Sequence, residues 1–544
     1  MKAVRAVLEF LSSGGVECIF GIPAGSVNGF FDEMYDMPHL TPVITKHEGA
    51  AAYMAAAYAK TSKRLGVCIG CSGPGSTNLL TGAANAMREQ LPVLFLTGAV
   101  PTNTVGLNAS QEFDSQKVFQ PLTKYSVTID GEKDLLQEVR FAVSIALSGI
   151  PGPVHIAVPL DIQLKEIPAP EILPFPQRQP IIPDPLQVKR AAAKLIEYKT
   201  GVVFVGQGAA QAVPELLELA EILQWPIVTT PQAKGLLPDS HPLVRGVYGF
   251  AGQESAVRLM HDGDHRMLLI VGSSLGETAT SNWNPQLTNG RFVLQLDYDP
   301  SVFNRKYNVD LPILGDANLS LQFLIKELQE AGLQRKSYHL SSTSKQPRTG
   351  IEYNTQNVLN TLQESLPSDT RYTIDIGEFM SYVIHYMRVP QSGAFDINVH
   401  FGAMGSAIGS AIGISLADSS RPVTCITGDG CFFMHGMEIL TAKEYNLPVL
   451  FVVMNNSRLG MVYHGHTLQY KRSHPRFEQQ PVNIAAMASA MGIPSARVEK
   501  HDDLSQELVR DLLVPGPSLL EIVLVDENIP PMGDRVKFLS SFGK

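Results

Sequence analysis

The chain has 544 residues, enough for about three domains, and its net charge of −9 is mild and spread along the chain, which argues against a nucleic-acid-binding surface. Its apolar runs are short and broken by Gly, Pro or charge, so we expect no membrane span. Glu9 interrupts the apolar N-terminal stretch, which predicts an amphipathic helix and not a signal peptide. Five cysteines are too few and too scattered for a disulfide framework, so we expect a reducing, cytoplasmic setting.

Residues 1 to about 165 alternate short apolar segments with helical patterns. The strand candidates are Cys18–Phe20, Thr41–Thr45, Gly66–Gly70 and Pro92–Leu96. Such alternation predicts a parallel sheet with helices on both faces. Cys68 and Cys71 form a CxxC pair, but no second pair completes a zinc site, so buried thiols are favoured over a metal or redox role.

A proline-rich stretch from about Glu166 to Asp184 predicts a linker to a second α/β domain, residues 185 to 335. This domain has strand candidates at Val202–Gly208 and Met267–Gly272. The Gly206-x-Gly208 pair is too short for a dinucleotide fingerprint, and a simple strand-to-helix turn is the better interpretation. A polar stretch at about 336 to 350 predicts a second linker.

The third domain, residues 350 to 544, contains two buried-strand candidates at 422–427 and 449–454. A helix is predicted between them, so the unit is a βαβ crossover. The helix is expected to end near Asn446 and to bury one face, made of Phe433, Met437, Leu440, Ala442 and Tyr445.

Polar residues follow both of these strands. Gly428-Asp429-Gly430 ends the first and Asn455-Asn456 ends the second, so Asp429 and Asn456 are expected at one sheet edge, where open α/β sheets bind ligands. A carboxylate, an amide oxygen and a nearby carbonyl, that of Arg458, suit Mg²⁺ together with phosphate oxygens. The glycines let backbone N–H groups approach a diphosphate. A plain βαβ unit with a chance Asn pair is the alternative.

The GDG and Asn-Asn pair at this spacing resembles the signature of thiamine diphosphate (ThDP) enzymes, in which the Asp and the second Asn hold Mg²⁺ on the cofactor. The resemblance covers the whole chain and implies an α/β fold of three doubly wound, mainly parallel sheets. The three domains would be a pyrimidine-binding domain (1–165), a central Rossmann-like domain (185–335) and a diphosphate-binding domain (350–544).

The same resemblance extends to two motifs of the first domain. Glu48, in the first turn of an Ala-rich helix, matches the glutamate that binds N1′ of the aminopyrimidine and promotes ylid formation; ordinary helix-dipole electrostatics is the alternative. Residues 71–78 resemble the family's SGPG-x-x-N loop, which assigns Gly73, Pro74 and Asn78 to cofactor binding.

Residues 108–114 resemble the Ala-Phe-Gln-Glu stretch of acetolactate synthases. Gln111 aligns with the glutamine that reaches the reacting carbon, and Ser110 replaces the family Phe, so a wider or more polar pocket is expected. Lys124 matches a lysine near the substrate entrance, although an ordinary surface lysine is an equally good interpretation.

Further matches to acetolactate synthases lie in the third domain. Gly377 and Glu378 end a segment that resembles the loop at the diphosphate, and Gly402 and Met404 resemble the Gly-x-Met-Gly segment that supports the bent cofactor, with core packing as the alternative for Met404. Met461, in Leu-Gly-Met-Val, is expected to face the substrate.

The chain also departs from the biosynthetic acetolactate synthases. Residues 272–278 lack both arginines of the segment that accompanies FAD there, so FAD is not expected, and neither is the arginine clamp for the acceptor carboxylate. Gly465 stands at the place of a downstream Trp. The pocket therefore differs from that of the biosynthetic enzymes.

The resemblance implies a ThDP- and Mg²⁺-dependent enzyme that decarboxylates a 2-oxo acid, most simply pyruvate, and joins the resulting enamine to a second carbonyl. The alternatives are a decarboxylase that releases an aldehyde, another ThDP lyase or acyl transferase, and a ThDP-fold protein without activity. Residues 100–120 contain no histidine to match the His pair of simple decarboxylases, although His464 or His466 could serve instead. The expected assembly is a homodimer, or a tetramer made of two dimers, with Glu48 and Asp429 at opposite ends of one shared cofactor.

Overall fold

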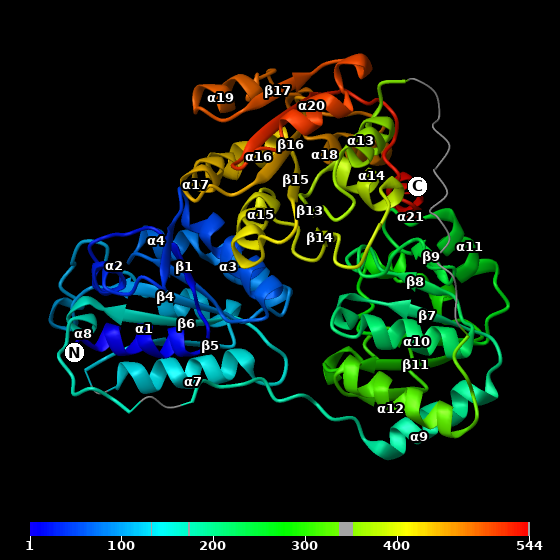
Figure 1. Cartoon of the computed structure of the whole chain (residues 1–544), viewed down its shortest axis with the longest axis horizontal. Helices are drawn as coiled ribbons and strands as arrows, with labels where there is room; N and C mark the ends of the chain where they lie inside the picture. The colour runs from blue at the N-terminus through cyan, green and yellow to red at the C-terminus, as the bar shows by residue number, and fades with distance from the viewer. Residues whose placement is uncertain (132, 172–173, 337–351, 542–544) are drawn as a thin grey trace.

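A computed structural model describes residues 1–131, 133–171, 174–336 and 352–541. It contains three six-stranded sheets, and every strand pairing in these ranges is parallel. The expected class, three doubly wound parallel α/β domains, is confirmed. Figure 1 shows the third domain packed above the first and the central domains.

The first domain is built on the sheet order β2-β1-β3-β4-β6-β5. Its strands are β1 (Cys18–Gly21), β2 (Thr41–Ile44), β3 (Gly66–Gly70), β4 (Val93–Ala99), β5 (Tyr125–Thr128) and β6 (Val154–Pro159). Its helices are α1 (Ala3–Ser13), α2 (Asn28–Tyr35), α3 (Glu48–Ser62), α4 (Pro74–Asn78), α5 (Leu80–Arg88), α6 (Ser115–Phe119), α7 (Leu135–Leu147) and α8 (Leu160–Gln163). The inner strands β1, β3, β4 and β6 are almost wholly buried, as expected for a sheet covered on both faces, whereas the edge strands β2 and β5 are partly exposed.

The central domain has the order β12-β11-β10-β7-β8-β9. Its strands are β7 (Gly201–Val205), β8 (Ile227–Thr229), β9 (Val244–Val247), β10 (Met267–Val271), β11 (Phe292–Asp297) and β12 (Leu311–Leu314), and its helices are α9 (Pro185–Glu197), α10 (Val213–Leu223), α11 (Glu254–Asp262) and α12 (Ala317–Glu330). The turn after β7 packs on the turn after β10, where the Gly208 N–H donates to the Gly272 carbonyl at 2.9 Å. This contact supports a simple strand-to-helix turn at Gly206.

The third domain has the order β14-β13-β15-β16-β18-β17. Its strands are β13 (Arg371–Ile374), β14 (Phe395–Ile397), β15 (Val423–Gly428), β16 (Val449–Asn455), β17 (Ser495–Val498) and β18 (Ser518–Val523). Its helices are α13 (Thr355–Ser365), α14 (Glu378–Tyr386), α15 (Ser406–Ala417), α16 (Asp429–His435), α17 (Ile439–Glu444), α18 (Gly460–Tyr470), α19 (Ile484–Ala490), α20 (Gln506–Asp511) and α21 (Asp534–Ser540). The expected second linker lies almost wholly outside the described residues.

The segment between β15 and β16 differs from the single helix that the sequence predicts. It is α16, a 3-10 turn at Gly436–Glu438 and α17. Phe433 and Met437, expected to be buried, are 47% and 48% exposed. Gly436 disfavours a continuous helix, and the break leaves Phe433 and Met437 exposed while Ala442, with Leu440 and Tyr445 beside it, still packs on the core.

The first and third domains share a hydrophobic core within the chain. Buried residues of α3 and of α15 belong to one continuous cluster, and the two helices pack side by side between the domains. The first and third domains are therefore packed on each other within one chain, although the central domain lies between them in the sequence.

Candidate active site

Glu48 occupies the first turn of α3, directly after the N-cap residue His47, whose ring nitrogen accepts from the Gly49 N–H at 3.0 Å. The Glu48 side chain is buried, and its Oε2 accepts a hydrogen bond from Asn78 Nδ2 at 2.9 Å. The structure thus joins two residues that the resemblance assigned from separate motifs. A buried carboxylate held by one amide is suited to hold or move a proton at a ring nitrogen.

The loop that contains Gly73, Pro74 and Asn78 lies beside the Gln111 loop. Ser72 Oγ donates to the Gln111 carbonyl at 2.7 Å, and a Cβ on Gly73 would lie 3.3 Å from that oxygen. Gly73 has φ 71°, so glycine fits its backbone. Pro74 begins α4, and Gln111 is exposed beside Ser110. Glu48, the SGPG loop and Gln111 therefore form one neighbourhood.

Asp429 and Asn456 lie at the carboxyl ends of adjacent parallel strands, because β15 pairs with β16 in a register that sets Gly428 opposite Met454. Asp429 begins α16 and is buried. Burial raises the pKa of Asp429 to about 6, although the backbone N–H groups of Gly430 and Ser457 stabilise its ionised form. Asn456 Oδ1 accepts from the Arg458 N–H at 3.1 Å.

These groups fit a divalent cation bound together with a cofactor. Among the described residues no group of three His, Cys, Asp or Glu side chains could hold a metal ion. One carboxylate, one amide oxygen and a main-chain carbonyl would leave several positions of an Mg²⁺ octahedron for phosphate and water oxygens. Buried Glu378 adds to the negative charge felt by Asp429, which a cation would offset.

The segment with Gly402 and Met404 lies against the start of α16. The methyl group of Met404 would lie 3.3 Å from a Cβ on Gly430, so the two residues are neighbours. Gly402 has φ 71° and open space where a Cβ would point. Asp375, buried after β13, accepts from the Gly405 N–H at 2.9 Å and so fixes the end of this segment. Gly402 and Met404 therefore lie on one segment that packs beside the start of α16.

The remaining predicted residues lie around the same sheet edge. Gly377 is the N-cap residue of α14 and Glu378 its first residue. Glu378 contacts Asn456, with Oε1 accepting from Nδ2 at 2.6 Å. Met461, in the first turn of α18, is half-buried against the core of the third domain.

The structure gives Lys124 a role other than those expected and adds Glu438 to the surroundings of Glu48. Lys124 Nζ donates to the main-chain carbonyls of Ile145, Ser148 and Ile150 at the end of α7. Lys124 therefore caps a helix, which is a role that neither interpretation anticipated. Glu438, which the sequence reading missed, accepts from the backbone N–H groups of Lys46 and His47, just before Glu48. In the sequence, the one local feature that marks Glu438 is a carboxylate between two apolar residues, Met437 and Ile439.

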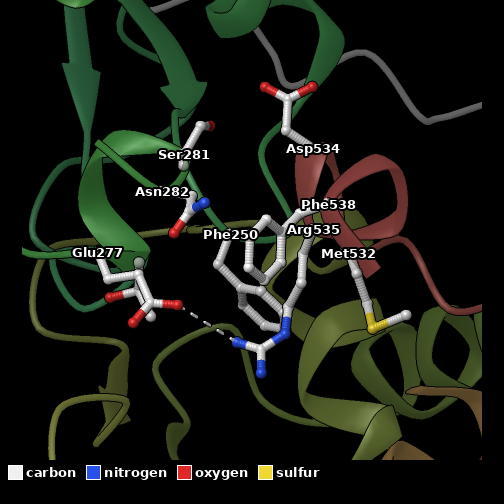
Figure 2. Close-up of a pocket in the computed structure, with 10 residues that line it drawn as sticks. Phe250, Glu277, Ser281, Asn282, Met532, Asp534, Arg535 and Phe538 are labelled. Carbon is white, nitrogen blue, oxygen red and sulfur yellow. Dashed lines mark ion pairs between the residues drawn. The ribbon is translucent and has the colours of Figure 1, made fainter. Parts of the chain in front are cut away.

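A separate pocket lies where the central domain meets α21 (Figure 2). Figure 2 shows the rings of Phe250 and Phe538 beside Arg535, whose guanidinium is 4.0 Å from Glu277 Oε1. Because α21 also packs on α18, this contact ties the helix after Asn456 to the central domain. None of the pocket residues belongs to the predicted site.

Within the described residues, no helix combines the length and apolar character needed to cross a membrane.

The chain is similar to known proteins across all three domains. Three family models match: the N-terminal, central and C-terminal domains of thiamine pyrophosphate enzymes, over residues 1–118, 188–324 and 375–522. The crystal structure of a Mycobacterium smegmatis protein, assigned as a thiamin diphosphate-dependent enzyme, covers 97% of this chain and 100% of its own with a TM-score of 0.81. At 20% identity, this likeness shows the fold alone.

Two relatives match almost the full length. The "Probable acetolactate synthase large subunit" of Methanocaldococcus jannaschii is 33% identical over 98% of this chain and 93% of its own. The "Acetolactate synthase isozyme 3 large subunit" of Escherichia coli is 30% identical over 93% of this chain and 92% of its own. The chain belongs to the acetolactate synthase-like family of thiamine diphosphate-dependent enzymes.

Proposed function

We propose that the protein decarboxylates a 2-oxo acid, most simply pyruvate, and transfers the two-carbon unit to a second carbonyl compound. The observation that carries the proposal is the pairing of Glu48 with Asn78 in a chain that matches acetolactate synthase large subunits over nearly its whole length. The second half of the site, Asp429 beside Asn456, supports it.

Different residues would act at the two ends of the cofactor. Bound ThDP supplies a carbon nucleophile and an electron sink. Glu48 would hold a proton at N1′, and Asn78 keeps the carboxylate in place. Asp429, Asn456 and the Arg458 carbonyl would hold Mg²⁺ at the diphosphate. Gly402 and Met404 would support the ring between these ends, and exposed Gln111 would reach the substrate.

Three further features belong to the proposal. FAD is not expected as a cofactor, in line with the missing arginines in residues 272–278. The assembly is a homodimer or a tetramer, with the cofactor at the subunit interface. The compartment is the cytoplasm, and the five free, buried cysteines of the described chain support a reducing setting.

The test is mass spectrometry of the products after purified protein is incubated with ThDP, Mg²⁺, pyruvate and a panel of aldehydes and oxo acids. A ligation product supports the proposal. Acetaldehyde as sole product would favour the simple decarboxylase, and no turnover of any 2-oxo acid would contradict both.

Glu48→Gln gives a second test, because an amide cannot exchange the proton at N1′. We expect hydrogen–deuterium exchange at the thiazolium carbon to slow by at least about 100-fold with an unchanged circular dichroism spectrum. Glu17→Gln, on the exposed surface of the same domain, is the control. Exchange at the wild-type rate in Glu48→Gln would refute the role of Glu48.

A further inference from the structure

Glu378 forms a buried hydrogen bond with Asn456, one of the proposed metal ligands. Its Oε1 accepts from Asn456 Nδ2 at 2.6 Å, and the residue is only 8% exposed. Among the described residues its Oε2 has no hydrogen-bond partner, and it lies 3.3 Å from His464 Nε2. A carboxylate in this place is a poor ligand for a diphosphate, because both groups are negatively charged.

The contact matters because the two ends of an asparagine side chain have the same shape but opposite chemistry. The amide oxygen can bind a cation, whereas the NH₂ group only donates. An ionised carboxylate only accepts, so Glu378 draws the NH₂ group of Asn456 toward itself. The oxygen, Oδ1, then faces away, on the side of the Arg458 N–H.

We propose that Glu378 is a positioning residue that fixes the amide of Asn456 with its oxygen toward the divalent cation. The inference rests on the proposed function, since it assumes that Asn456 binds that cation. Groups behind a metal ligand commonly set its orientation and affect metal affinity strongly.

Two cationic or titratable side chains accompany the buried charge of Glu378. Arg458 Nη2 is 4.0 Å from Glu378 Oε2 and 3.2 Å from His464 Nε2. The guanidinium is held by the Asp526 carbonyl at 2.6 Å and lies over the Tyr463 ring at 4.6 Å. The Arg458 side chain therefore places a positive charge near the Glu378 carboxylate, while the Arg458 main-chain N–H donates to Asn456.

The start of α18 is shaped for the same contact. A Cβ on Gly460 would overlap the Glu378 carboxylate, so only glycine allows the first turn of α18 to approach it. Gly460 follows Asn456 by four positions, which ties the helix start to the same carboxylate.

Three variants test the inference by isothermal titration of Mg²⁺ into protein saturated with ThDP. In Glu378→Gln, Arg458 attracts the amide oxygen of the new glutamine, so the glutamine NH₂ group can turn toward Asn456. The Asn456 side chain would then rotate to present its oxygen to that NH₂ group, away from the cation. Glu378→Asp keeps the charge but is one methylene too short to reach Asn456. We expect either change to weaken Mg²⁺ binding by about 10- to 100-fold.

The double variant Glu378→Gln with Asn456→Asp exchanges the amide and the carboxylate. The introduced carboxylate has an oxygen at both ends, so it needs no orientation, and the amide at 378 can donate to it. We expect Mg²⁺ affinity within about threefold of the wild type, which is under 1 kcal/mol. Thermal unfolding of each variant monitors the fold.

Each outcome bears on the inference. Wild-type affinity in Glu378→Asp would overturn it in favour of a simple charge effect. Failure of the double variant to recover affinity while it remains folded would overturn it in favour of direct ligation by Glu378. If the wild-type protein itself binds no ThDP with Mg²⁺, the proposed function fails, and that result is distinct from either of the others.

Discussion

At the scale of single residues, Glu438 connects the third domain to the turn that presents Glu48. Its Oε1 accepts from the N–H groups of Lys46 and His47 at 2.9 and 2.8 Å, and its Oε2 accepts from Thr441 Oγ1 at 2.7 Å. It is 1% exposed, and burial raises the pKa of Glu438 to about 7, against the opposing effect of these hydrogen bonds and of the Lys46 charge. The position of Glu48 thus depends on a residue 390 positions away.

The raised pKa makes stability depend on pH in a definite direction. The folded protein holds the Glu438 proton more tightly than the unfolded chain, so this stabilisation is complete below about pH 4.5 and is lost as pH rises through about 7. Glu438→Gln mimics the protonated form, since its oxygen can accept from both N–H groups and its NH₂ group can donate to Thr441. We expect the variant to match the wild type near pH 4.5 and to be more stable, by up to about 3 kcal/mol, near pH 8.

The measurement is the unfolding midpoint of both proteins across this pH range. Glu444→Gln, an exposed position of the same segment, is the matched control and should show no such divergence. A constant difference between Glu438→Gln and the wild type at all pH values would show that Glu438 does not titrate in this way.

At the scale of elements, the packing of α15 on α3 depends on two glycines one turn apart. A Cβ on Gly409 would lie 2.9 Å from the Ala50 carbonyl oxygen, and one on Gly413 would overlap the Met54 carbonyl oxygen. The helix backbones therefore touch without intervening side chains. This contact joins the helix that begins with Glu48 to the helix that follows Met404 and Gly405.

We expect Gly413→Ala to destabilise the protein by about 1–3 kcal/mol, because the added methyl group forces the two helices apart. Gly465→Ala in α18 is the control: in the described part of the chain its Cβ would meet only Leu539, at 3.9 Å, so the higher helix propensity of alanine should leave stability unchanged or raised. Thermal unfolding of both variants is the measurement. Equal stability of Gly413→Ala and the wild type would mean that the helices can separate at little cost.

The sequence predicted the elements whose signal is local. Apolar runs such as Gly66–Gly70 became buried strands, and the Gly428-Asp429-Gly430 stretch lies at the expected strand end. The break at Gly436 was missed, because a single glycine competes weakly with a strong helical pattern. Glu438 and Lys124 were missed or misread because their partners are backbone groups that only the folded chain brings near. The pairing of Glu378 with Asn456 was hidden for the same reason, since 78 residues separate them.

At the scale of the whole molecule, one polar cluster joins all three domains. Lys60 of α3 pairs with Asp396 of β14 at 2.5 Å and with Glu89, after α5, at 3.8 Å. Gln232 of the central domain donates to both oxygens of Glu89 at 2.8 Å. The carboxylates thus depend on one lysine that is 24% exposed along its side chain.

We expect Lys60→Met to lower stability by about 2–4 kcal/mol, because two mostly buried carboxylates lose their cation. The loss should appear as a lower midpoint temperature of unfolding or as faster proteolysis at the domain junctions. Lys194→Met, which removes an exposed ion pair with Glu197, is the control and should change stability by less than about 1 kcal/mol. A Lys60→Met protein as stable as the control would show that the cluster is not needed for docking of the domains.

The first and third domains share a core within one chain, so their separation along the sequence does not by itself require a second chain. The proposed dimer is supported by three large apolar side chains that are exposed on the segment after Asp429. Phe433, Met434 and Met437 are each about half exposed, next to the proposed metal site. Large apolar side chains that are exposed close together in the sequence fit the proposed subunit interface.

Mixing two inactive variants tests whether the two halves of each site come from different chains. Glu48→Gln lacks the residue at one end of the cofactor, and Asp429→Ala lacks the residue at the other. If sites form between chains, half of the dimers in a fully exchanged equal mixture are mixed, and each has one wild-type site, so about a quarter of wild-type activity should return. If each site forms within one chain, every site in the mixture lacks one residue and no activity returns. Glu48→Gln alone is the control and should stay inactive. Sedimentation verifies that the two variants associate with each other. A wild-type protein that is fully active as a monomer would contradict the shared site.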